Sequence, residues 1–298
     1  GARNPGRSLL AVVLVASACF VLVAVGVFRR DPRQEALGKS SGTGGFELVA
    51  ESRVPLREDL SNPDDLADLG VSAEAAAVIA GTEFHALRVL PGEDASCLNL
   101  YRPQTPRVLG VPPSLAERGG FTFHGTLEEV DDPWSLLDLD LPPETDPETG
   151  RPVPVVPALG DEASVTWILR LGLGDDVVMV DDRGERVRLR IVGLLSRSIF
   201  QSELLIAERD FVRHFPAHGG YAYFLADTPP GEADETAALL EGELASRGLD
   251  VTGTADRLAS YQAVENLDLA TFQALGGLGL LLGTLGLGVV LLRNLLER

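Results

Sequence analysis

Two long runs of uncharged, mostly apolar residues stand near the ends of the chain, and a mixed segment separates them. The first run covers Ser8–Phe28 and the second covers Leu275–Leu292, where Thr284 is the polar side chain. A helix needs about 20 apolar residues to cross the ~30 Å hydrocarbon core of a membrane. A secretory signal has a shorter apolar core of roughly 7–15 residues. The pattern therefore predicts two membrane helices, within residues 1–30 and 272–293.

The second run contains six glycines, a residue that weakens helices in water. A phosphate-binding loop is a poor explanation, because a P-loop requires a lysine within the motif and the single lysine, Lys39, is distant. In lipid, small residues let helices approach closely. One predicted helical face carries Gly276, Gly279, Gly283 and Gly286. We interpret these four as a helix-packing face; the alternative is that membrane helices tolerate glycine anywhere.

Between the runs, apolar positions alternate over short stretches, which is typical of half-buried strands. Such stretches begin at Phe46 and cover Glu83–Leu90, Cys97–Leu100, Arg107–Val111, Asp176–Val180, Arg186–Leu195 and Tyr221–Asp227. Ser72 is placed to cap a helix over Ala73–Ala80. A second helix is predicted from the stripe of Ala233, Ala237, Leu240 and Leu244, which ends near Gly248. Strands and helices in this mixture predict an α+β domain.

The sequence also predicts where the parts of the chain begin and end. Residues 131–157 are rich in proline and acidic side chains and predict a solvated loop or a crossing between subdomains, not a core element. From residue 255 onwards there is no proline, and 44 helical residues would extend about 66 Å. The predicted order is a first membrane helix with a cytoplasmic basic flank (1–30), a linker (31–45), an extracytoplasmic α+β core domain of two mixed subdomains (46–254), a helical stalk (255–271), a second membrane helix (272–293) and the start of a cytoplasmic segment (294–298).

Charge supports this orientation and excludes one class of partner. The formal net charge is −19, and every acidic residue except Glu297 lies between the two runs. Arginines flank the runs on their outer sides, as expected for cytoplasmic ends, although Arg29 and Arg30 weaken this indication. An acidic middle segment is a poor partner for nucleic acid. We therefore expect a membrane protein with an acidic extracytoplasmic domain and no nucleic-acid partner.

Candidate catalytic and metal-binding residues are few. His214 and His218 have the i,i+4 spacing of a helical zinc site, but Pro216 separates them and the metalloprotease glutamate is missing, so ordinary surface histidines are expected. The "GKSSG" of Gly38–Gly42 matches a serine-hydrolase motif by chance, because it lies in a predicted linker. Cys19 and Cys97 are not expected to pair. We expect no enzyme activity, no metal and no cofactor in this chain.

Three segments resemble the FtsX/MacB-like permease family of ABC transporters. They are "RNPGRSLL" at Arg3–Leu10, "LGLGDDVVMVDDRGERVRLRIVGLL" at Leu171–Leu195 and the glycine-rich tail from Thr271 to Arg298. The resemblance covers nearly the whole chain, with a less clear match over Phe46–Pro157. It implies a MacB-like periplasmic core domain between membrane helices. Since the chain starts at Gly1 and stops soon after the second run, we expect it to be part of a longer permease.

The resemblance also implies a function. Such permeases pair with a separate cytoplasmic ATPase that binds ATP, and many couple its ATP-driven dimerisation to movement of extracytoplasmic domains, which is called mechanotransmission. The implied partners are that ATPase, a second permease half or protomer, the lipid bilayer of the bacterial cytoplasmic membrane and a periplasmic protein. Two alternatives remain open on the residues alone: a two-span membrane sensor with a ligand-binding ectodomain, and a membrane-tethered hydrolase.

Overall fold

The computed structural model describes residues 38–92, 105–147 and 150–296, together with six earlier residues: Val13, Ala16, Ser17, Cys19, Phe20 and Val23. These residues belong to two compact units. One unit consists of residues 33–258 and is a folded domain; the other consists of residues 1–32 and 259–298 and contains most of a long helix. The predicted strand at Cys97–Leu100 and most of the first predicted membrane helix lie outside the described residues.

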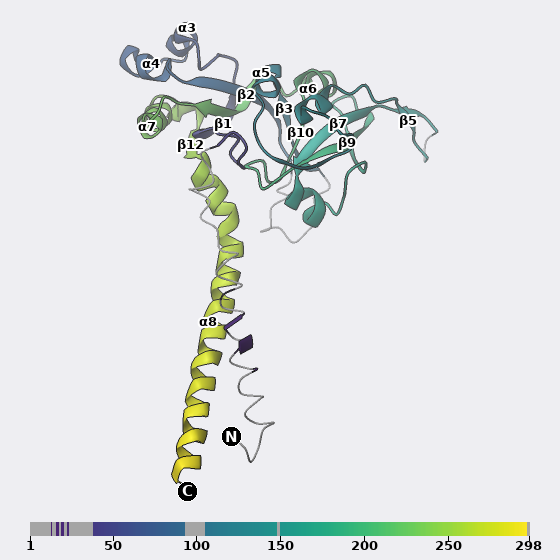
Figure 1. The fold of residues 1–298 in the computed structure, drawn as a ribbon. Helices are drawn as coiled ribbons and strands as arrows, with labels where there is room; N and C mark the ends of the chain where they lie inside the picture. The colour runs from purple at the N-terminus through teal and green to yellow at the C-terminus, as the bar shows by residue number, and fades with distance from the viewer. Residues whose placement is uncertain are drawn as a thin grey trace. The chain divides into compact units, whose positions relative to one another are not determined.

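One mixed sheet runs through the whole domain (Figure 1). Its strands follow the order β12 (Leu249–Gly253), β1 (Leu48–Leu56), β11 (Tyr221–Asp227), β2 (Glu83–Leu90), β3 (Arg107–Val111), β10 (Glu203–Ala207), β7 (Val155–Asp161), β9 (Arg186–Leu195) and β4 (Phe123–Thr126), with β8 (Asp176–Val180) also paired to β9. The pairs β3–β10 and β7–β9 are parallel and the other pairs are antiparallel. Because β2 pairs with both β11 and β3, the two predicted subdomains share a single sheet and form one compact unit.

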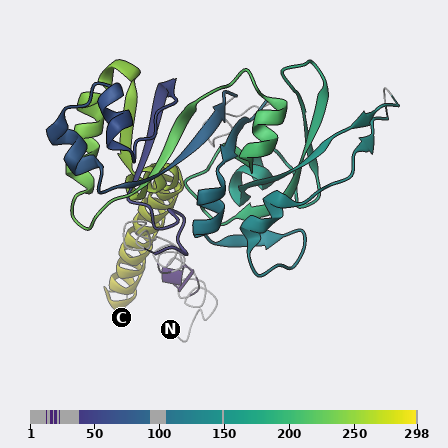
Figure 2. The same ribbon diagram turned by 90° about the horizontal axis from the view of Figure 1, so that it is seen from above.

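Three helices cover one face of the sheet at strands β12, β1, β11 and β2 (Figure 2). They are α3 (Pro63–Asp68), α4 (Ala73–Ile79) and α7 (Ala233–Glu243). The predicted cap is confirmed, since the Ser72 hydroxyl accepts a hydrogen bond from the Ala75 amide at 3.4 Å. Leu240 and Leu244 of the predicted stripe are buried against this face. Gly248 ends the following 3-10 turn η3 (Ala245–Arg247) with a φ of 66°, which glycine adopts at little cost.

The other half of the sheet is buried on both faces. Along β10, Leu204 and Ile206 point to a cluster with Phe211 of α6 (Glu208–His214), while Leu205 and Ala207 point to the opposite cluster. Neighbouring side chains on a strand alternate between faces, so a strand covered on both sides is apolar at most positions, and the carboxylates of β10 and β7, Glu203 and Asp161, have polar partners. This is why β10 and β7 read as continuous apolar runs and not as alternating ones.

The prediction of a solvated loop at residues 131–157 is wrong over much of its length. Residues Pro133–Asp138 form a 3-10 helix, η1, whose Trp134, Leu136 and Leu137 are buried in the core. The strand β7 begins at Val155 and is buried along its whole length. The apolar residues embedded in this acidic segment decide how it packs. The free energy gained by burying them exceeds the free-energy cost of ordering the flanking prolines and carboxylates.

The acidic residues of the same segment have a separate role. The two-stranded arm of β5 (Glu144–Thr145) and β6 (Pro152–Val153) lies against the arginine-bearing face of β9. Arg186 pairs with Asp146 at 2.8 Å and Arg190 pairs with Glu144 at 2.7 Å, while Asp176 of the neighbouring strand β8 also pairs with Arg190, at 2.8 Å. The predicted alternation of arginine and apolar residues in β9 is confirmed; its arginines are covered by this acidic arm and are not simply in water.

The predicted linker differs from expectation from Gly38 onwards. The Phe121 amide donates to the Lys39 carbonyl at 2.6 Å and the Ile199 amide donates to the Gly42 carbonyl at 2.9 Å. Gly42 lies so close to Arg197 that an added Cβ would stand 1.9 Å from its carbonyl oxygen. These bonds fix the "GKSSG" segment on the domain as consecutive turns. The small residues there serve close packing, and turns followed by strand β1, not a helix, come after the motif.

The long helix α8 covers Thr254–Leu296, as predicted from the absence of proline. From Leu275 onwards most of its described large apolar side chains are exposed, and Leu285 has 60% of its surface accessible. The described residues of the first apolar run are helical, and Val13, Phe20 and Val23 are also exposed. Among the residues that the structure describes, no helix meets the combined length and apolarity needed to cross a membrane.

Candidate functional site: the first turn of helix α8

Helix α8 starts directly at the end of β12. Thr254, its first residue, is hydrogen-bonded to the two residues that precede β1. The Thr254 amide donates to the Glu47 carbonyl at 2.9 Å, and its hydroxyl donates to the Phe46 carbonyl. Asp256 places a negative charge in the first turn, where the helix dipole favours it. Leu258, one turn on, is 4% exposed and belongs to the main core cluster. The first turn of α8 is therefore part of the domain.

Five residues hold this turn to the middle of the sheet, and we call them the clasp: Glu51, Arg107, Glu203, Tyr223 and Arg257. They come from β1, β3, β10, β11 and α8 respectively. One carboxylate oxygen of Glu51 contacts the Arg257 guanidinium at 2.5 Å and the other contacts Arg107 at 2.7 Å. Arg107 also reaches Glu203 at 3.2 Å. Both guanidinium groups lie over the Tyr223 ring, at 5.7 and 5.6 Å from its centroid.

The clasp is sheltered from water, which strengthens its electrostatic interactions. Glu203 is 3% exposed and Arg107 is 23% exposed. Burial alone would raise the pKa of Glu51, but Arg257 and Arg107 together hold that pKa below its ordinary value. Burial alone would lower the pKa of Arg107, whereas Glu203 and Glu51 raise it, with a net upward shift. Both shifts favour the ionised forms of Glu51 and Arg107 at neutral pH.

The lowered pKa of Glu51 gives a pH-dependent contribution to stability. Replacing Glu51 by glutamine is expected to lower the free energy of unfolding at pH 7 by about 1.5–3 kcal/mol, because a charged hydrogen-bond partner is lost. The folded pKa lies below the unfolded value of 4.5, so the stabilisation is complete above pH 4.5 and is lost as the pH falls through the folded pKa. The difference between wild type and Glu51→Gln, measured by urea unfolding, should therefore shrink below pH 4.5.

The matched control is Glu235→Gln, at an exposed carboxylate in the first turn of α7. This variant should unfold close to the wild type throughout the same pH series. A difference between wild type and Glu51→Gln that stays constant down to pH 3 would contradict the role given to the Glu51 charge.

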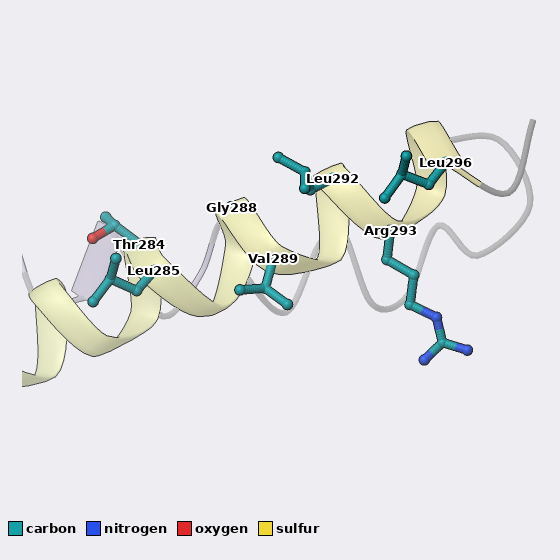
Figure 3. Close-up of a pocket in the computed structure, with 7 residues that line it drawn as sticks. All are labelled: Thr284, Leu285, Gly288, Val289, Leu292, Arg293 and Leu296. Carbon is teal, nitrogen blue, oxygen red and sulfur yellow. The ribbon is translucent and has the colours of Figure 1, made fainter.

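The four glycines predicted as a packing face all lie in α8, in the helical unit. At Gly279, Gly283 and Gly286, no described atom lies within 4 Å of the place a Cβ would take, so their face is open. The groove on this helix is elsewhere (Figure 3). It is lined by Thr284, Leu285, Gly288, Val289, Leu292, Arg293 and Leu296. At about 3.6 residues per turn, Gly288 lies on the opposite side of the helix from the predicted face.

The histidines are placed differently from expectation in one respect. His214 is buried at 6% exposure, and its Nδ1 lies 3.6 Å from an Asp181 carboxylate oxygen, so it is not a surface residue. It is buried because the turn after β8 folds over the last turn of α6, where the Asp182 amide donates to the His214 carbonyl at 3.1 Å. His218 lies beyond Pro216 and beside Asp182 at 3.8 Å. Within the described part of the chain, no three acidic, histidine or cysteine residues are grouped as metal ligands.

His85 is also buried, on β2. Its Nδ1 lies 3.2 Å from the Ser114 hydroxyl, and burial, the largest influence, lowers its pKa. The Phe46 ring meets it edge to face at 5.5 Å. His124 is exposed and lies 3.2 Å from Glu162.

Comparison with known proteins gave matches to solved structures. The chain is similar to the periplasmic region of MacB from Actinobacillus actinomycetemcomitans, with 12% identity over 76% of this chain and 95% of that one and a TM-score of 0.36. It is also similar to the extracellular domain of the noncanonic ABC-type transporter YknZ from Gram-positive bacteria, with 13% identity over 70% and 98% and a TM-score of 0.29. No protein-family model and no curated protein matches the chain. Both matched structures are domains of the kind that the sequence resemblance names.

The clasp was not predicted from the sequence. Its five members lie on five elements that are far apart along the chain, and each residue alone reads as an ordinary strand or helix residue. One signal does exist: Glu203 is the one carboxylate in the otherwise apolar strand segment ELLIA. A charge in such a position is paired in folded proteins, so a search for arginines on neighbouring strands would have suggested Arg107.

Proposed function

We propose that this chain is the helix–domain–helix unit of a permease subunit in an ABC transporter, located in the bacterial cytoplasmic membrane. The apolar runs cross the bilayer, and the acidic domain lies outside the cytoplasm. A separate cytoplasmic ATPase binds ATP, and this chain carries neither a nucleotide site nor an enzyme activity. The permease couples ATP hydrolysis to movement of the extracytoplasmic domain, in export or in an envelope function, by mechanotransmission.

The clasp is the observation that supports the proposal most directly. A long apolar helix attached by a flexible linker would lose any motion before it reached the domain. Here the first turn of α8 is held by a threonine cap, by Leu258 in the core and by the Arg257–Glu51 pair. A displacement of this turn therefore acts on β1, and through Arg107 on β3 and β10. Interiors are close-packed and transmit strain.

The exposed apolar side chains of α8 are the second support. From Leu275 to Leu296 eight leucine and valine side chains are more than half exposed, namely Leu275, Leu278, Leu281, Leu282, Leu285, Val289, Leu292 and Leu296. Soluble monomers rarely present such extended apolar surface to water. Lipid tails or a neighbouring membrane helix would cover this surface. In a membrane, glycines allow helices to pack closely. The alternative of a two-span sensor shares this topology and makes no use of an ATPase.

The proposal is tested on the permease expressed together with its ATPase. Replacing Gly279 and Gly283 by leucine should reduce the amount of permease–ATPase complex that can be purified and, with it, the ATP hydrolysis measured. The reason is that bulky side chains prevent close helix packing. A loss of about 1.4 kcal/mol in packing corresponds to a tenfold change in association. Gly279→Ala together with Gly283→Ala is the matched control, because alanine keeps both side chains small, and this variant should assemble as the wild type does. ATP hydrolysis in nanodiscs is the measurement.

A labelling experiment tests membrane insertion separately. With Cys19 and Cys97 replaced by serine, a cysteine at Leu285 should resist a water-soluble maleimide in intact membranes, whereas a cysteine at the exposed Glu74 of α4 should react. Rapid labelling at both positions would exclude the membrane helix. Protection at Leu285 together with purification of a chain that never associates with an ATPase would exclude the permease and favour the sensor.

A further inference from the structure

The domain presents one of its two tryptophans to solvent, on a rigid support. Trp167 is 76% exposed, whereas Trp134 is 2% exposed. Trp167 lies in η2 (Ser164–Ile168), a π-helical turn, and such turns are frequent at functional sites. An exposed tryptophan is costly in water and is typical of the anchors at binding interfaces.

Buried polar contacts fix the turn that carries Trp167. Asp161, which is fully buried, accepts hydrogen bonds from the Ala163 amide at 3.0 Å and from the Ser198 amide and hydroxyl at 2.7 and 3.0 Å. The Ser164 hydroxyl accepts from the Ser202 amide at 3.0 Å. On the inner side of the turn, Val165 is fully buried in the core. The position of Trp167 is therefore set before any partner arrives, which reduces the entropy lost on binding.

Two further exposed apolar side chains lie on segments that adjoin this turn. The Leu171 amide donates to the Val165 carbonyl at 2.9 Å, which fixes the "LGLGD" loop beside η2. In that loop Leu173 is 37% exposed, and Leu127, after β4, is 41% exposed. The two loops meet, since the Leu127 side chain lies 3.5 Å from the Cβ position of Gly174. We call Trp167, Leu173 and Leu127 the tryptophan patch.

The charged residues on the segments that carry the tryptophan patch are mostly acidic. Exposed or half-exposed carboxylates on the same segments are Glu128, Glu129, Asp131, Glu162 and Asp175. Arg170 supplies a positive charge among them, with its backbone at a φ of 56°. Charged side chains around an apolar centre select partners of complementary potential and speed their encounter.

We propose that the tryptophan patch docks a partner protein through a segment that combines aliphatic side chains with lysine or arginine. The apolar centre accepts the aliphatic residues, and the carboxylates around it pair with the cations. The acidic character of this whole chain, with a net charge of −19, disfavours a second copy of the chain as the occupant. This proposal does not depend on the transporter function, because it concerns the domain surface alone.

Intrinsic fluorescence of the full chain in neutral phosphatidylcholine nanodiscs provides the test. Acrylamide reaches Trp167 and not the buried Trp134, so quenching reports on the patch. A peptide of alternating lysine and leucine should protect Trp167 from acrylamide, while peptides of alternating glutamate and leucine, or lysine and serine, should not. Leu173→Ala and Leu127→Ala together should weaken binding of the lysine–leucine peptide by about 30-fold, the effect of losing a binding hot spot.

A matched control and three outcomes complete the test. Thr166→Ala, at the neighbouring exposed position, should bind the peptide as the wild type does. Equal protection by all three peptides would overturn the proposal. Protection by anionic phosphatidylglycerol vesicles without protection by the lysine–leucine peptide would assign the patch to a membrane surface and overturn it. Quenching that falls as the concentration of the chain itself is raised would assign the patch to self-association, with the same consequence.

Discussion

Replacing Arg107 by methionine is expected to lower the free energy of unfolding of the domain by about 3–5 kcal/mol, the usual cost of removing one member of a buried ion pair. Arg107 contacts both Glu51 and Glu203. Its removal leaves Glu203, which is 3% exposed, with less compensation for its charge in a poorly solvated position. Urea unfolding followed by circular dichroism at pH 7 measures the change.

Arg209→Met is the matched control for that variant. Arg209 also pairs with a carboxylate, Asp138 at 2.9 Å, but the two side chains are 51% and 70% exposed. Its second partner, Asp210 at 3.3 Å, keeps Arg213 as a partner in the variant. Exposed ion pairs contribute about 0–1 kcal/mol, so this variant should unfold nearly as the wild type does. Equal effects of Arg107→Met and Arg209→Met would show that the clasp contributes no more than a surface ion pair.

The second large effect is expected at Trp134. Trp134→Ala should destabilise the domain by about 3–5 kcal/mol, the range for removing a large buried aromatic side chain. The indole meets Phe121 and Phe123 at ring-centroid distances of 5.9 Å each, and its Nε1 donates to the Gly120 carbonyl at 3.0 Å. The truncated residue would leave a cavity among these rings and an unpaired carbonyl. Thermal and urea unfolding measure the loss.

The exposed tryptophan supplies the control for this experiment. Trp167→Ala removes the same side chain from a position that is 76% exposed, and its stability should stay within about 0.5 kcal/mol of the wild type. A small effect of Trp134→Ala would mean that the η1 segment is not part of the cooperative core.

Local patterns predicted the elements of the domain well where one face of an element is buried. The strands β2, β3, β8 and β9 and the cap at Ser72 follow directly from alternation and capping chemistry. Local patterns failed where a segment has mixed signals. Around Trp134 the prolines and acids predict a loop, but long-range contacts with aromatic residues of β4 and of the preceding loop decide the outcome.

The clasp could not be predicted from local sequence patterns. The predicted glycine face depends only on spacing within one helix, which a sequence shows. The clasp depends on the order of strands in the sheet, which brings Glu51, Arg107 and Glu203 side by side although more than 150 residues separate the first from the last. Strand order is set by packing of the whole domain, so no short segment encodes it.

The pairing of β1 with β12 has a mechanical consequence. The two strands are antiparallel, with Leu48 opposite Gly253 at one end and Ser52 opposite Leu249 at the other. The chain enters β1 and leaves β12 at the same end, so tension on the two chain ends would unzip this ladder one hydrogen bond at a time instead of shearing it. Thr254 bonds Phe46 and Glu47 at that end, whereas the Glu51 that pairs with Arg257 of α8 lies opposite Asp250, nearer the other end of the ladder. A pulling force would therefore load the Thr254 bonds before the first rung of the ladder opens.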